Sequence, residues 1–115
     1  MADQVAVRLP KSRWPEKTTF TATVNFRTLS TAAASTPTTI HYRIDCLSTK
    51  TKLQDWTSVS AAAEATITIT STHNAIQDDN NNRERRQILV QADQGLSTQA
   101  TGRAVWLVEN YHGIS

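Results

Sequence analysis

Along most of this chain, apolar residues occupy every second position and polar residues lie between them. In residues 19–26, one face of an extended chain carries only Phe20, Ala22, Val24 and Phe26. In residues 39–47, one face carries Ile40, Tyr42, Ile44 and Cys46. A two-residue period is typical of a β-strand that has one face in a core and the other in solvent. Both segments are therefore predicted to be strands.

Further segments show the same period. They cover residues 52–59, 65–71, 87–92 and 99–108. The alternation is imperfect in residues 52–59, as expected of a short edge strand or of a strand with a bulge. Residues 5–9 also alternate and form either a first strand or an arm. No segment carries a helical stripe, so the sequence predicts an all-β fold, an antiparallel β-sandwich of about seven strands.

The length of 115 residues is that of one domain. We expect the sandwich to cover residues 18–110, preceded by residues 1–17 as an arm or first strand plus connector and followed by residues 111–115 as a tail. Residues 72–86 contain the run Asp78-Asp79-Asn80-Asn81-Asn82 and are predicted to form a long exposed loop.

Charge and hydropathy argue against several kinds of partner. Lys and Arg number 12 against 10 Asp and Glu, a net charge of +2, and no basic stripe favours a nucleic acid. No apolar run is long enough to cross a membrane, and the N-terminus lacks the pattern of a secretory signal. Synthesis in a cytoplasm is expected. Cys46 is the single cysteine, which predicts a small buried side chain and no internal disulfide.

No pattern in the sequence indicates an enzyme or a cofactor. His41, His73 and His112 have no metal-ligand spacing and are interpreted as surface residues. The three glycines are too few for a phosphate-binding loop of known type. The run 78–82 lacks the glycine and glutamate of an EF-hand, which leaves a loose calcium site or a hydrated loop. We predict no catalytic, cofactor or metal site.

The residues outside the alternating strands are the candidate partner contacts. Arg83, Arg85 and Arg86 either grip an acidic partner or form the solvated start of a strand paired with nearby aspartates. Trp14 either plugs the end of the sandwich or anchors on a neighbour. The full candidate set is Val5, Val7, Trp14, Arg83, Arg85, Arg86, Tyr111, His112 and Ile114.

The strand-like segments 20–27, 40–47, 55–59 and 65–70, together with the last two predicted strands, resemble an immunoglobulin-like or fibronectin-type sandwich. The resemblance covers about residues 18–110. An antibody-type domain carries a Cys pair between its sheets, and this chain has only Cys46. The short, Thr-, Ala- and Ser-rich, Cys-poor chain also resembles small structural proteins of tailed bacteriophages.

That second resemblance implies a virion structural protein made in the bacterial host cytoplasm. The first expectation is a capsid decoration or cement subunit that binds the major capsid protein or other virion proteins and also self-associates. It would attach through sheet edges, the N-terminal arm and the tail. The alternatives are a tail, baseplate or head–tail connector component, and a surface- or glycan-binding module. Neither a nucleic acid nor a membrane is an expected partner.

Overall fold

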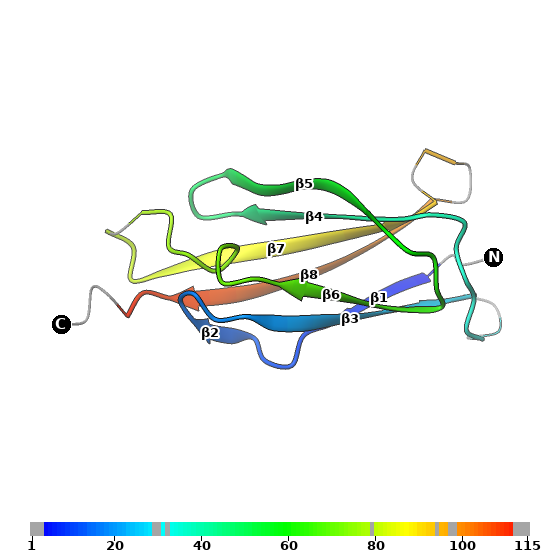
Figure 1. Ribbon diagram of the computed structural model, residues 1–115, viewed down its shortest axis with the longest axis horizontal. Coiled ribbons are helices and arrows are strands. Elements are labelled where there is room, and N and C mark those ends of the chain that lie inside the picture. The colour runs from blue at the N-terminus through cyan, green and yellow to red at the C-terminus, as the bar shows by residue number, and fades with distance from the viewer. Residues whose placement is uncertain are drawn as a thin grey trace.

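In the computed structural model, the described part of the chain is all-β, with eight strands in two sheets (Figure 1). The structure describes residues 4–28, 31, 33–78, 80–93, 95–96 and 99–111, and these contain no helix. The strands are β1 (Gln4–Arg8), β2 (Arg13–Pro15), β3 (Phe20–Arg27), β4 (Ile40–Cys46), β5 (Thr51–Val59), β6 (Glu64–Ile69), β7 (Arg83–Ala92) and β8 (Ala100–Glu109). With no helix in the described ranges, none of them holds a helix that could cross a bilayer.

One sheet has the order β1-β3-β6 and the other the order β2-β8-β7-β4-β5. Neighbouring strands are antiparallel except β2, which runs parallel to β8. The expected wholly antiparallel architecture of about seven strands is therefore corrected to eight strands with mixed pairing. The extra strand is short, because only Arg13, Trp14 and Pro15 pair with β8 and Pro15, which has no backbone N–H, ends the ladder.

The inward faces of the two sheets share one apolar core. β3 contributes Phe20, Ala22, Val24 and Phe26, the set expected from the alternation, and each is buried. Trp106 of β8 is the largest of these side chains, and the Phe20 ring meets it edge-on with the centroids 5.5 Å apart. Alternating apolar residues on both sheets therefore hold the layers together.

β5 forms one edge of the five-stranded sheet and is irregular, as predicted. Its register with β4 shifts twice, between Tyr42 and Ile44 and again between Ile44 and Asp45. At each shift β5 has one residue more than β4 over the same stretch. Such bulges twist an edge strand and interrupt its ladder.

β7 begins four residues earlier than the sequence predicted, at Arg83 instead of Gln87. The segment before it is also less exposed than expected, because His73 and Asn74 are buried. The prediction of a surface His73 is therefore wrong, and so is that of a long exposed loop over residues 72–86, since Glu84 and Arg86 in that range are buried as well. The buried polar side chains of His73 and Asn74 are tolerated because each has a hydrogen-bond partner, Gln54 for His73 and Trp106 for Asn74.

β1 crosses the inner side of the other sheet at Gly102 of β8. A Cβ atom added to Gly102 would lie 2.6 Å from Val5 Cγ1 and 2.8 Å from the Val5 carbonyl oxygen. Both distances are far below van der Waals contact. Glycine at this position therefore allows the N-terminal strand to lie against β8.

Candidate interaction surfaces and the polar cluster behind them

A buried ion pair lies at the end of the molecule where the chain leaves β6 and enters β7. Glu84 and Arg86 occupy inward positions of β7, and both side chains are fully buried. Arg86 Nη1 lies 2.9 Å from Glu84 Oε1. Two buried opposite charges with further bonds satisfy the conditions under which such a pair is tolerated.

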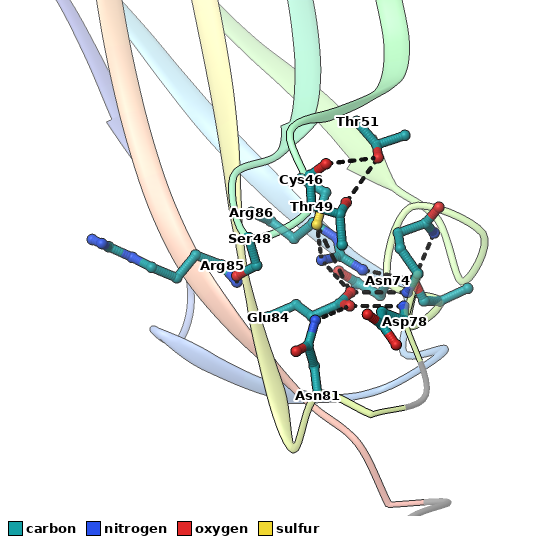
Figure 2. A network of polar contacts seen from close by, with 12 residues as sticks. Cys46, Ser48, Thr49, Thr51, Asn74, Asp78, Asn81, Glu84, Arg85 and Arg86 are labelled. Atoms are coloured by element: carbon teal, nitrogen blue, oxygen red, sulfur yellow. Dashed lines mark hydrogen bonds and ion pairs between the residues drawn. The ribbon is translucent and has the colours of Figure 1, made fainter.

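The Arg86 guanidinium also holds the preceding loop. Its Nε donates to the carbonyl of His73 at 3.0 Å, and its Nη2 donates to the carbonyl of Ala75 at 2.6 Å. Nη1 additionally lies 3.0 Å from Sγ of Cys46 on the neighbouring strand β4. One side chain therefore joins β7 to β4 and to residues 73–75 (Figure 2).

Glu84 binds the other half of the same loop. Its carboxylate accepts hydrogen bonds from the backbone N–H groups of Gln77 and Asp78 and from the Asn81 side chain, each at 2.9 Å. Burial by itself raises the pKa of Glu84, but these donors together with Arg86 lower the pKa below its ordinary value. The carboxylate therefore stays ionised and fixes the loop around it.

Asn74 and His73 connect the loop to the apolar core and to β5. The Asn74 side-chain oxygen accepts a hydrogen bond from Trp106 Nε1 at 2.9 Å, and its amide nitrogen donates to the Thr18 carbonyl. His73 contacts Gln54 Oε1 through Nε2 at 3.2 Å, and burial lowers the pKa of its imidazole. The loop that contains the polar run 78–82 is therefore anchored at its start by the buried side chains of His73 and Asn74.

The three candidate arginines separate into two kinds. Arg83 and Arg85 are exposed, whereas Arg86 is fully buried in the ion pair. Arg85 projects from the opposite side of β7, away from the buried cluster (Figure 2). The expectation that Arg86 is a solvated partner contact is wrong, because its guanidinium already bonds to Glu84, Cys46 and the loop.

The candidate residues of the N-terminal segment all contact this chain's own core. Val5 and Val7 are half-buried and pack against it from β1, which pairs with β3. Trp14 is 9% exposed and stacks on Phe20 with the ring centroids 4.2 Å apart. Of the two alternatives for Trp14, the structure shows the plug, and the ring is not accessible to a neighbour in this conformation.

At the other end of the chain, Tyr111 is 54% exposed. His112 and Ile114 lie outside the residues that the structure describes. Among the described residues, no three His, Cys, Asp or Glu side chains are grouped so that they could hold a metal ion. Asp78 uses a carboxylate oxygen to accept the N–H of Asn80 at 3.0 Å.

An open sheet edge lies along β6. The Phe26 N–H donates to the Ala63 carbonyl at 2.9 Å, in the same register that pairs Val24 with Ala65 and Ala22 with Ile67. In an antiparallel ladder alternate residues bond to the partner strand, so the backbone groups of Thr66 and Thr68 point to the other side. No described strand lies there, because β6 is the last strand of its sheet.

The outward face of the five-stranded sheet carries a second feature, which the sequence analysis did not identify. Leu89, Val105 and Leu107 alternate with the inward residues of β7 and β8 and are half-buried without joining the core. Trp56 is likewise half-buried and outside the core, beside the bulge of β5. The signal was present in the sequence: the 99–108 segment is apolar at 105 and 107 as well as at 104, 106 and 108.

No protein-family model matches the chain, and no curated protein matches it.

Proposed function

We propose that this protein is a non-enzymatic structural subunit of a virion, specifically a capsid decoration subunit, that attaches to its neighbours by strand addition at the β6 edge. The observation that carries the proposal is that edge. Its backbone donors and acceptors at Thr66 and Thr68 have no partner among the described residues, and these two outward side chains are neutral. An unblocked edge of this kind is a template for a strand from another chain.

The contrast with the other long edge supports the choice of β6. β5 carries two register shifts and the charged pair Lys52–Asp55, whose side chains lie 3.2 Å apart. Bulges and charges are the features that block strand addition. β6 has six residues in continuous register with β3 and one charge, Glu64, at its start.

We further propose that the fold is immunoglobulin-like. Such domains place strands A, B and E in one sheet and C, F and G in the other, with C′ added in the variable type. The orders β1-β3-β6 and β8-β7-β4-β5 fit that arrangement. The pattern departs from the antibody type in three respects: no described strand D lies beside β6, Cys46 has no partner, and the buried tryptophans are on β2 and β8 rather than on the C-like strand β4.

The missing D strand connects the fold to the proposed function. In a four-stranded ABED sheet, strand D pairs with E and covers its edge. Here residues 60–63 lead directly from β5 to β6, so the equivalent edge stays open. A strand from a virion neighbour would complete the sheet. Because the contact would be repeated over a symmetric shell, many weak contacts together would hold the subunits more tightly than any single one.

Two substitutions at Thr68 test the role of the edge. Thr68→Pro removes the outward N–H and leaves the bonds to β3 in place, and proline is tolerated at such edge positions. Thr68→Val retains the N–H and is the matched control. Wild-type and Thr68→Val protein should bind purified particles that lack the chain, whereas Thr68→Pro should lose about tenfold in affinity or more.

A charge provides a second test if the proline variant fails to fold. Thr68→Lys keeps the backbone intact and places a charge where an added strand would lie. Equal particle binding by Thr68→Lys and Thr68→Val would rule out strand addition at β6. Absence of the chain from purified particles would overturn the virion assignment itself. Its position on imaged particles separates a shell subunit from a tail component.

A further inference from the structure

Two rows across the outward face of the five-stranded sheet alternate apolar and arginine side chains, and the row between them holds Asp45, Gln87 and Val105. In one row, Leu89 lies between Arg43 of β4 and Arg103 of β8. In a second row, Arg85 lies between Leu47 and Leu107, since Leu47 N–H donates to the Arg85 carbonyl and Arg85 pairs with Leu107. These side chains share one face because residues paired across strands point the same way.

The charges of this face are only partly neutralised by its own acids. Arg43 lies 2.9 Å from Asp45, and Arg13 lies 3.2 Å from Glu109. Arg85 and Arg103 are exposed, and neither side chain makes an ion pair within the part of the chain that the structure describes. The face therefore carries unneutralised positive charge around an apolar centre.

From this pattern we infer that the outward face of the five-stranded sheet binds an acidic protein surface whose carboxylates surround an apolar patch. The inference deepens the proposed function and rests on one part of it, that the chain acts by binding another protein. Leu89, Val105 and Leu107 would pack against the apolar patch, while Arg85 and Arg103 would pair with carboxylates around it.

The dimensions of the face suit such a partner. β7 spans ten residues, or about 33 Å, and five strands span about 19 Å. The area of the face is therefore comparable to the area that each partner buries in a standard interface, about 800 Å². A central apolar group within a charged rim is the usual composition of an interface. The combination distinguishes this face from the threonine-covered outer side of β6.

The same charges argue against two other occupants. A second copy that docked through the same face would oppose arginines to arginines, a like-charge contact that suppresses association. A nucleic acid would pair with the arginines but would leave the leucines and Val105 without apolar contacts, since its recognition rests mainly on phosphates. An acidic protein surface matches both components.

The test uses the full-length protein, labelled with ¹⁵N, and two soluble probes. One probe is a short peptide of glutamate and leucine, and the other is poly-L-glutamate of the same length. NMR titration should place the shifted amides on the outward residues of β4, β7 and β8. The glutamate–leucine peptide should bind more tightly than poly-L-glutamate, because only it supplies an apolar partner.

Charge reversal provides the matched control. Arg85→Glu and Arg103→Glu should each weaken peptide binding by about tenfold, whereas Arg8→Glu, an exposed reversal on the opposite sheet, should leave it unchanged. Equal weakening by all three variants, shifts confined to other surfaces, or no binding of either peptide would overturn the inference. Tighter binding of duplex DNA at this face would assign it to nucleic acid instead.

Binding to particles separates this inference from the proposed function. If wild-type protein and both charge-reversed variants bind particles equally, the virion role stands and the face is not its contact. If the peptides bind as expected and the chain is absent from particles, the face is a protein-binding site and the virion role is wrong.

Discussion

Replacement of Arg86 by methionine tests the buried cluster at the β6–β7 end of the molecule. The substitution keeps a long side chain and removes the charge. It leaves the Glu84 carboxylate without its buried counter-ion and the His73 carbonyl without its side-chain donor, while the Ala75 carbonyl keeps only the bond from Gln77 Nε2. The neighbouring Arg85 is exposed and therefore offers a control one residue away.

The expected loss follows from these contacts. Removing one partner of a buried ion pair costs about 3–5 kcal/mol, because the remaining charge stays buried. Glu84 retains three N–H donors, so the loss of unfolding free energy should be smaller than the cost of an isolated buried charge. With unfolding free energies of about 5–15 kcal/mol for a domain, Arg86→Met removes a large part of the stability.

Urea unfolding followed by tryptophan fluorescence measures this loss. For an m-value of about 2 kcal/mol/M, a loss of about 4 kcal/mol lowers the midpoint by about 2 M. Arg85→Met should stay within about 0.5 kcal/mol of wild type. The double variant Glu84→Gln/Arg86→Met should recover part of the loss, because the uncompensated charge is gone. A midpoint for Arg86→Met equal to that of Arg85→Met would refute this account of the cluster.

Three further predictions concern stability. Gly102→Ala should cost about 1–3 kcal/mol in the same urea assay, because its methyl group meets the Val5 backbone oxygen; an unchanged midpoint would mean that β1 does not lie there. Trp14→Ala should cost about 3–5 kcal/mol, whereas a freely exchanging arm would tolerate the change. The pKa of His73 is lowered from 6.5 and that of Glu84 from 4.5, so the unfolded chain binds more protons than the native one in acid. The free energy of unfolding should therefore fall as the pH drops below about 6.5 and fall again below about 4.5. His73→Gln should abolish only the upper step. A free energy of unfolding that rises on acidification would contradict both assignments.

The alternation of apolar residues was sufficient to predict six of the strands. Phe20 to Phe26 and Ile40 to Cys46 place only apolar side chains on one face, so the period gives both the strand and its buried side. The irregular residues 52–59 also carried information, since β5 lies at an edge and has the bulge that was one of the two alternatives, although with nine residues it is not short. Periodic patterns indicate a strand wherever one face is uniformly apolar.

The start of β7 was missed because its inward positions carry charges. Glu84 and Arg86 are in phase with Ile88, but Arg83 and Arg85 on the other face are charged too, so no apolar face marks the strand. The only signal in the sequence was a pair of opposite charges, Glu84 and Arg86, which lie two residues apart and on the same strand face as the predicted core residue Ile88. β2 was missed because three residues are too few to show a period, and its pairing with β8 depends on the tertiary fold.

The outward apolar residues were missed for a related reason. Val105 and Leu107 lie between core residues of β8, so the segment is apolar on both faces and its outer face is hidden in the pattern. The sequence alone cannot show that Leu89 lies between Arg43 and Arg103, since that row depends on the register of three strands.

Electron cryo-microscopy of purified virus particles from cells that produce this chain tests the central claim most directly. We predict many symmetric copies on the shell, each with a neighbour's strand beside β6 and with Leu89 and Arg103 against an acidic surface. Particles that lack the chain, or copies whose β6 edge and five-stranded sheet both face solvent, would contradict the account.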